Sequence, residues 1–139
     1  MTTEAMKAAT VLVVDDDDAV RAVASKVLRR AGYDVIEADG AGEALRIAQE
    51  RAGALDLLLT DVVMPGLNGR ELSERIREQY PRVRVLFMSA YTEDEVILQG
   101  VQVAEVDFLA KPFNLESLTR SVQQALTRGS TGLPEPFPS

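Results

Sequence analysis

The sequence predicts an α/β protein in which helices cover both faces of a doubly wound, five-stranded parallel sheet. Two observations support this fold class. Short apolar runs, rich in β-branched residues, alternate with longer stretches in which apolar residues recur at helical spacing. The runs are apolar almost throughout, as in strands buried on both faces, and right-handed crossovers place helices on those faces. A length of 139 residues is typical of one domain.

The first unit begins with TVLVV at Thr10–Val14, a short β-branched run that predicts a strand. Apolar residues then recur on one helical face, at Val20, Val23, Val27 and Leu28. This helix is expected to stop near Gly32, because glycine commonly follows the last helical turn. DVIEA at Asp34–Ala38 predicts the second strand, and residues 41–52 predict the second helix.

The third and fourth units follow the same order. LDLLLT at residues 55–60 predicts a strand, and residues 70–80 predict a helix that Pro81 closes. VRVLFM at residues 83–88 predicts the fourth strand, and weaker helical spacing follows over residues 92–99. Each unit again pairs one short apolar run with one helix, which favours the parallel arrangement.

The fifth unit closes the predicted domain. VDFLA at residues 106–110 predicts the last strand, and helical spacing continues over residues 115–128. Asn114 is the expected N-cap of this helix, because its side-chain oxygen can accept a hydrogen bond from a free backbone N–H. Gly129 is its expected end.

We expect one domain over residues 10–128, preceded by a flexible N-terminus at residues 1–9. Residues 129–139 (GSTGLPEPFPS) are rich in Gly, Ser and Pro, which predicts a disordered tail or a linker remnant. The first residues lack the apolar core of a signal peptide, and no later run is long enough to cross a bilayer. These features lead us to expect a cytoplasmic protein.

Charge and composition disfavour several classes of function. The 22 acidic residues outnumber the 15 Lys and Arg residues and leave a formal charge of -7, which opposes direct binding to nucleic acid or to an anionic membrane. The absence of cysteine excludes disulfides and thiolate metal ligands. The absence of histidine removes the commonest general base.

Polar residues end four of the five predicted strands. They are Asp15 to Asp18, Thr60 with Asp61, Ser89, and Lys111 with Pro112. Ligands of an open parallel sheet bind beyond the carboxyl ends of its strands, so we expect these four ends to converge. Carboxylates that meet at one edge raise one another's pKa unless a cation or a lysine compensates. Oxygen ligands without sulfur or imidazole favour Mg²⁺, with Mn²⁺ as an alternative.

Four segments of the chain resemble the signature segments of bacterial response-regulator receiver domains. They are VLVVDDDDAVR, LLLTDVVMPGLNGREL, VLFMSAYTED and FLAKPFNLESL, and they occur in the right order between residues 10 and 128. The resemblance implies a flavodoxin-like fold with strand order 2-1-3-4-5. It also implies two-component signalling, in which a sensor histidine kinase or a histidine phosphotransfer protein donates a phosphoryl group to an aspartate. The donor histidine must belong to a partner, because this chain contains none.

The same resemblance implies a role for each residue of the metal site. Asp61 is the implied phosphoacceptor and also a ligand of Mg²⁺. Asp16 is implied as a direct metal ligand, and Asp15 as a contributor through water. The backbone carbonyl of Val63 is implied as the third protein ligand. The family is a phosphoacceptor signalling domain rather than an enzyme, although it phosphorylates and dephosphorylates itself with Mg²⁺.

Further residues are implied to bind the phosphoryl group and to switch. Lys111, Ser89 and the backbone of Ala90 are implied phosphate-binding groups. Ser89 and Phe108 together are implied as the switch, in which Ser89 moves toward the phosphate and the aromatic ring follows. A cis peptide bond is implied at Lys111–Pro112. The switched surface would bind a downstream effector of unknown identity, and we expect a monomer or a weak phosphorylation-dependent dimer.

Two positions depart from common family members. Val63 and Tyr91 stand where many relatives carry polar or acidic side chains that guide a hydrolytic water. We therefore expect slow self-dephosphorylation. The segment VLFMSAYTEDEV also resembles receivers fused to the C-terminus of sensor kinases, so origin in a hybrid kinase and a stand-alone relay both stay open.

Each single feature also has an ordinary structural interpretation. Asp18 could simply cap the first helix, with Asp17 as a structural neighbour, and Gly69 could only serve a turn. Two rival functions also stay open. A phosphatase of the haloacid dehalogenase type uses an aspartate nucleophile and a D-x-D pair, which Asp15 to Asp17 contain, but it places the nucleophile on its first strand. A degenerate receiver would bind proteins without taking phosphate, but the intact Asp61, Ser89 and Lys111 set argues against it.

Overall fold

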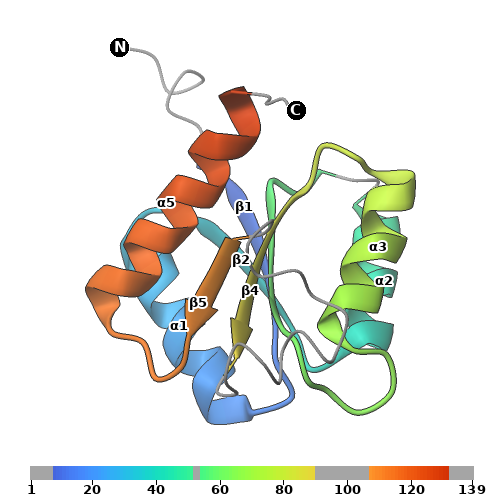
Figure 1. Ribbon diagram of the computed structural model, residues 1–139, viewed down its shortest axis with the longest axis horizontal. Helices are drawn as coiled ribbons and strands as arrows, with labels where there is room; N and C mark the ends of the chain where they lie inside the picture. Colours follow the sequence, from blue (N-terminus) through green and yellow to red (C-terminus); the bar gives the residue numbers. More distant parts are fainter. Residues whose placement is uncertain (1–7, 52–53, 90–106, 132–139) are drawn as a thin grey trace.

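The computed structural model describes residues 8–51, 54–89 and 107–131. In these residues, five strands form one parallel sheet in the order β2-β1-β3-β4-β5 (Figure 1). The strands are β1 Thr10–Val14, β2 Asp34–Ala38, β3 Leu57–Asp61, β4 Arg84–Ser89 and β5 Asp107–Ala110. The helices are α1 Asp18–Arg30, α2 Ala41–Glu50, α3 Gly69–Gln79 and α5 Leu115–Thr131. The predicted fold class and the strand order are both confirmed.

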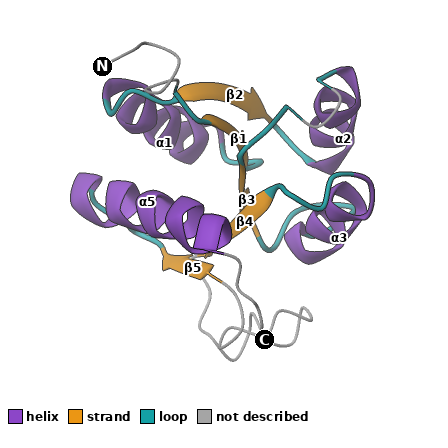
Figure 2. Ribbon diagram, turned by 90° about the horizontal axis from the view of Figure 1, so that it is seen from above, coloured by secondary structure: helices purple, strands orange, loops and turns teal. Residues whose placement is uncertain are grey.

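Helices cover both faces of the sheet, with α1 and α5 on one side and α2 and α3 on the other (Figure 2). Alternate residues of β1 face opposite layers, as the two-residue period of a strand requires. Val11 and Val13 are buried in a cluster with residues of α1 and α5. Leu12 and Val14 are buried in a second cluster with residues of α2 and α3. The nearly continuous apolar strands in the sequence are therefore explained by burial on both faces.

The bounds of β1 and β2 match the predicted ones, whereas those of β3 and β4 differ by one or two residues. The third strand begins at Leu57 instead of residue 55 and includes Asp61, which pairs with Met88. The fourth includes Ser89, which pairs with Ala110. In these two strands the hydrogen-bonded ladder continues one residue beyond the apolar run, because backbone pairing does not require an apolar side chain. The helix predicted over residues 92–99 lies outside the described residues.

The first helix is capped by Asp17, so the interpretation of Asp18 as its cap is wrong. The side chain of Asp17 accepts hydrogen bonds from the backbone N–H groups of Ala19 and Val20, at 3.0 and 3.2 Å. Asp18 lies in the first helical turn, where its carboxylate forms an ion pair with Arg21 at 2.7 Å. In a run of four aspartates the sequence does not distinguish cap from first turn, because both positions favour acidic side chains.

The last helix begins as predicted but ends later. Asn114 accepts a hydrogen bond from the backbone N–H of Ser117 at 2.7 Å, which confirms it as the cap. The helix does not stop at Gly129 and continues to Thr131, so the first three residues of the predicted tail are helical. A glycine inside a helix costs only about 1 kcal/mol, which does not by itself end a helix. Within the part of the chain that the structure describes, no helix has the length and apolar character needed to cross a membrane.

Candidate functional site

Strand register brings the predicted site residues to one edge of the sheet. Val14 is paired with Thr60 in β3, so the residues after them, Asp15 and Asp61, leave neighbouring strands side by side. Backbone hydrogen bonds continue past the last paired residues, from Asp15 N–H to the Ala38 carbonyl at 3.3 Å. The carboxyl ends of β1 and β3 therefore present their acidic side chains at one place, as expected for an open parallel sheet.

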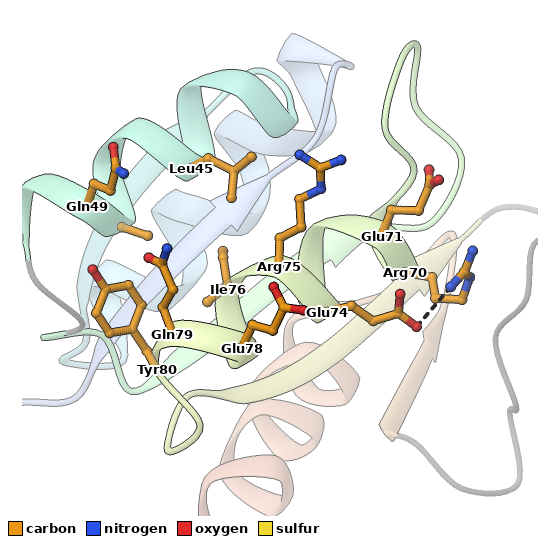
Figure 3. Close-up of a pocket in the computed structure, with 11 residues that line it drawn as sticks. Leu45, Gln49, Arg70, Glu71, Glu74, Arg75, Ile76, Glu78, Gln79 and Tyr80 are labelled. Atoms are coloured by element: carbon orange, nitrogen blue, oxygen red, sulfur yellow. Dashed lines mark hydrogen bonds and ion pairs between the residues drawn. The ribbon is translucent and has the colours of Figure 1, made fainter.

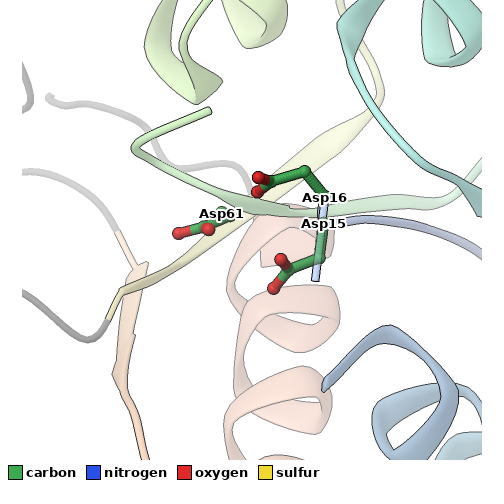
Figure 4. A group of neighbouring side chains, drawn as sticks. All are labelled: Asp15, Asp16 and Asp61. Atoms are coloured by element: carbon green, nitrogen blue, oxygen red, sulfur yellow. The ribbon is translucent and has the colours of Figure 1, made fainter. Parts of the chain in front are cut away.

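Three carboxylates meet at this edge. One oxygen each from Asp15, Asp16 and Asp61 lies within 4.8 Å of the others (Figure 4). Asp15 is fully buried and Asp61 is 7% exposed, whereas Asp16 is exposed to solvent. The predicted convergence of the acidic residues is thus present, with one member open to the surroundings.

Lys111 is the cation that the structure provides. Its Nζ lies 2.7 Å from Oδ2 of Asp15 and 3.4 Å from Oδ2 of Asp61. Burial lowers the pKa of Lys111, but the hydrogen bond to Asp15 and the charges of both carboxylates outweigh this effect and raise it overall. The lysine therefore stays charged at neutral pH. The peptide bond between Lys111 and Pro112 is cis, as predicted.

The carboxyl group of Asp61 has an unusually high pKa. Burial raises this pKa to about 6; the charge of Lys111 opposes the rise, and the charge of Asp15 adds to it. A carboxylic acid with this pKa is mostly ionised at pH 7, although burial makes its charged form energetically unfavourable. Any cation that binds nearby would lower its pKa.

The acidic cluster fits a hard divalent cation. Three carboxylates face one ammonium group, which leaves an excess of negative charge at the site. Among the described residues, the carboxylate of Asp16 has no hydrogen-bond or ion-pair partner, so it can bind a cation without breaking a contact. All the side-chain donors in the cluster are oxygens, which Mg²⁺ prefers. The residues present therefore suit the Mg²⁺ ion that the sequence predicted.

Comparison with known proteins identifies the family. The sequence profile of the response regulator receiver domain matches residues 11–123. This chain belongs to the receiver domain family. Domains of this family act in two-component systems.

Similar proteins come from two kinds of signalling protein. The sensor kinase CckA of Brucella abortus is 38% identical over 91% of this chain. The DNA-binding transcriptional regulator NtrC of Azospirillum brasilense is 38% identical over 87%. The crystal structure of the receiver domain from the hybrid histidine kinase CckA is 41% identical, with a TM-score of 0.71 over 84% of this chain and 98% of that one. The sequence identity is the same to a sensor kinase and to a DNA-binding regulator, so it does not show which kind of protein this receiver domain belongs to.

The receiver domain spans only a small part of its full-length relatives. It covers 13% of the Brucella kinase and 25% of the Azospirillum regulator. Origin in a hybrid kinase thus stays a prediction, and so does the division into residues 1–9, 10–128 and 129–139.

The predicted switch residues lie on neighbouring strands of the receiver domain. Ser89 ends β4 and is fully buried. Phe108 is paired with Phe87 across β4 and β5 and is half-buried against the cluster that contains Phe87 and Val62. Ala90 and Tyr91, for which the sequence also predicted roles, lie outside the described residues.

Gly69 is a site residue whose role the sequence analysis missed. A Cβ atom at this position would lie 2.1 Å from the backbone oxygen of Asp61 and 3.1 Å from Cα of Val62. The backbone N–H of Gly69 also donates a hydrogen bond to the carbonyl of Val62 at 2.8 Å. Gly69 therefore allows α3 to begin directly against the end of β3 at Asp61. Its position as the first residue after the Asn68 cap, where no turn requires glycine, was the available signal.

A groove of the receiver domain lies away from the acidic cluster. A groove of about 680 Å³ runs between α2 and α3, and Arg70 and Glu74 form an ion pair of 2.8 Å at its rim (Figure 3). None of the residues with predicted roles at the acidic cluster lines this groove.

Proposed function

We propose that this receiver domain accepts a phosphoryl group on Asp61 from a phosphohistidine donor, in a reaction that depends on Mg²⁺. The observation that carries the proposal is the buried carboxylate of Asp61, which lies 3.4 Å from the ammonium of Lys111 and within 4.8 Å of two further carboxylates. An aspartate between a fixed ammonium and a cation site is suited to attack phosphorus, because both cations offset the charge of the incoming group.

The transfer exchanges one bond to phosphorus for another. A carboxylate oxygen of Asp61 bonds to phosphorus while the P–N bond of the donor breaks and its electron pair returns to the imidazole ring. When bound, Mg²⁺ would neutralise charge that develops on the phosphoryl oxygens. Asp16, Asp61 and the backbone carbonyl of Val63 would hold the ion directly, and Asp15 would do so through water.

Phosphate binding and switching complete the proposal. Lys111, the hydroxyl of Ser89 and the backbone of Ala90 would hold the phosphoryl oxygens. Movement of Ser89 toward the phosphate would then draw Phe108 inward and change the surface around β4 and β5. The burial of Ser89 and the place of Phe108 beside an apolar cluster on the adjacent strand support a two-state element.

The lifetime of the acyl phosphate provides a prediction about Val63. Val63 lies two residues after Asp61, and its apolar side chain cannot orient a hydrolytic water. Substitution of Val63 by asparagine is expected to shorten the lifetime of the phosphorylated protein several-fold, because an amide can position water for attack. The decay of the phosphorylated form, followed by intact mass after removal of the donor, measures it. An unchanged lifetime would contradict the predicted role, and Tyr91 would then be the remaining candidate.

A protein donor is supported by an apolar hollow beside Lys111. The hollow has a volume of about 570 Å³ and lies between the start of α1 and the segment that follows β5. Its lining includes Ala19, Val20, Val23, Pro112 and Phe113. Val23 is 55% exposed although it is a large apolar residue. Apolar exposure next to Lys111 suits contact with a protein that carries the phosphohistidine.

Docking of this donor can be tested at Val23. Substitution by aspartate is expected to slow transfer from a phosphorylated histidine protein by about tenfold, because it puts a charge in the apolar contact. The same variant should react with acetyl phosphate at the wild-type rate, because a small donor needs no docking surface. Ala22→Asp, which adds the same charge to an exposed position of α1 outside the hollow, is the matched control. Equal losses with both donors would contradict the docking proposal.

Phosphoryl uptake itself is tested by mass. With Mg²⁺ and acetyl phosphate, the wild-type domain is expected to gain the mass of one phosphoryl group, and a chelator should prevent the gain. Reduction of the product with borohydride converts an aspartyl phosphate into homoserine, so peptide mapping should find homoserine at position 61 and at no other aspartate.

The two rival functions give different results in the same experiment. No gain in mass by a folded protein, with hydrolysis during handling excluded, would indicate a degenerate receiver that only binds partners. Steady consumption of acetyl phosphate without an adduct would indicate a phosphatase. Homoserine at a position other than 61 would show that a different aspartate accepts the phosphoryl group.

A further inference from the structure

A partly buried arginine lies beside the acidic cluster and contacts three segments of the chain. Nη1 of Arg21 donates a hydrogen bond to the backbone carbonyl of Asp15 at 2.8 Å. Its Nη2 lies 2.7 Å from Oδ1 of Asp18, and its Nε lies 3.4 Å from Oε1 of Glu37. The side chain is only 17% exposed. One guanidinium thus joins the end of β1, the first turn of α1 and the strand β2.

These contacts hold the turn between β1 and α1 from both ends. The guanidinium of Arg21 donates a hydrogen bond to the carbonyl of Asp15. The backbone N–H of Arg21 donates another to the carbonyl of Asp17 at 3.0 Å. The carboxylate of Asp15 accepts a hydrogen bond from the Asp17 N–H at 2.9 Å and a second from Lys111 at 2.7 Å. Asp16 lies between two residues that are fixed in this way.

The arginine is itself held in place. Glu37 also binds Arg29 at 3.1 Å, and Arg29 donates a further hydrogen bond to the carbonyl of Val35 at 3.1 Å. The two carboxylates beside Arg21 offset its charge, so it opposes a cation at the cluster less than an unpaired arginine would. Only arginine can make these three contacts, because its planar guanidinium carries donors on three nitrogens whereas lysine has a single ammonium group.

We propose that Arg21 is a positioning residue for Mg²⁺ binding. It fixes the backbone of Asp15 to Asp17, so that the free carboxylate of Asp16 is oriented before the ion arrives. Residues that orient metal ligands commonly contribute about tenfold or more to metal affinity, because without them the ligands must be ordered on binding. This inference rests on the proposed function for the assignment of Asp16 as a metal ligand.

The test measures Mg²⁺ binding in the absence of any phosphoryl donor. Amide NMR signals of Asp16 and Asp17 are followed during Mg²⁺ titration of the wild type, Arg21→Ala and Arg21→Lys. We expect about tenfold weaker binding for Arg21→Ala and incomplete recovery for Arg21→Lys. Faster hydrogen exchange at the Asp17 amide, beyond any change in global exchange, is also expected without metal. Phosphorylation should then need more Mg²⁺ but approach the wild-type rate at saturation.

Arg29→Ala is the matched control. It removes the other arginine that binds Glu37 but makes no contact with Asp15, so Mg²⁺ affinity should stay within about twofold of the wild type. Unchanged Mg²⁺ affinity in folded Arg21→Ala, or an equal loss in Arg29→Ala, would overturn the positioning role. Failure of the wild type to take up phosphate while it still binds Mg²⁺ would overturn the proposed function alone.

Discussion

Substitution of Asp61 by asparagine is expected to abolish phosphoryl uptake and, at the same time, to stabilise the metal-free receiver domain by about 1–2 kcal/mol at pH 7. Uptake is lost because an amide does not form an acyl phosphate. Stability rises because the native structure holds the Asp61 carboxylate at an unfavourable site, where burial raises its pKa to about 6. The full shift from 3.8 would be worth about 3 kcal/mol, and contact with solvent reduces it.

The sign of this effect follows from proton binding. Because the pKa of Asp61 is higher in the folded state than in the unfolded state, the folded state binds more protons between pH 4 and pH 6. The contribution of this group to stability is therefore lost as pH rises through that window, and the penalty is complete above the folded pKa. The advantage of Asp61→Asn over the wild type should shrink as the pH falls from 7 to about 4.5.

Urea unfolding of both proteins at several pH values, without metal, measures this difference. Asp39→Asn is a matched control, because it removes the same charge from an exposed position after β2 and should change stability little. Addition of Mg²⁺ should stabilise the wild type more than Asp61→Asn. A less stable Asp61→Asn at pH 7 would show that the carboxylate stabilises the metal-free fold, contrary to the argument from its pKa.

Substitution of Gly69 by alanine is expected to destabilise the domain by about 2–4 kcal/mol and to slow phosphoryl uptake strongly. The added methyl group would lie 2.1 Å from the backbone oxygen of Asp61, which is not a flexible side-chain end that can move aside. Either α3 or the end of β3 must shift, and a shift of β3 displaces Asp61 from Lys111. For a domain of this size the melting temperature should fall by about 10 °C.

Gly42→Ala is a control for glycine replacement. Gly42 lies on the exposed face of α2, and a Cβ atom there would meet nothing within 4 Å. Alanine at this position should raise stability by up to about 1 kcal/mol, because it is the better helix former, and should leave phosphorylation unchanged. Thermal unfolding and the rate of reaction with acetyl phosphate measure both variants. Wild-type stability in Gly69→Ala would mean that the close approach of α3 to Asp61 relaxes without cost.

Much of the fold could be predicted because its signals are local. Apolar runs and helical spacing indicated each described strand and helix within a few residues, because strands buried on both faces are apolar at nearly every position. The strand order came from resemblance to known receivers, because periodicity carries no information about which strands are neighbours. The cis peptide bond at Lys111–Pro112 was likewise implied by resemblance and is present.

Other features could not be predicted because they depend on distant backbone. The prediction that the last helix ends at Gly129 was wrong. A single weak helix former does not stop this helix, which continues to Thr131. The interpretation of Asp18 as the cap of the first helix was wrong, because four consecutive aspartates offer equivalent side chains and Asp17 is the cap. The role of Gly69 was missed, because its position after the Asn68 cap does not show which distant backbone it meets.

The sequence by itself determined the alternation of strands and helices and the polar residues at the ends of four strands, because both depend on residue type and spacing along the chain. Tertiary structure alone decided that Lys111 lies 2.7 Å from Asp15, although 96 positions separate them, and that Asp61 is buried enough to raise its pKa. It also decided that α3 begins against the backbone of Asp61. Distances and desolvation arise only when the strands pair, so no local pattern records them.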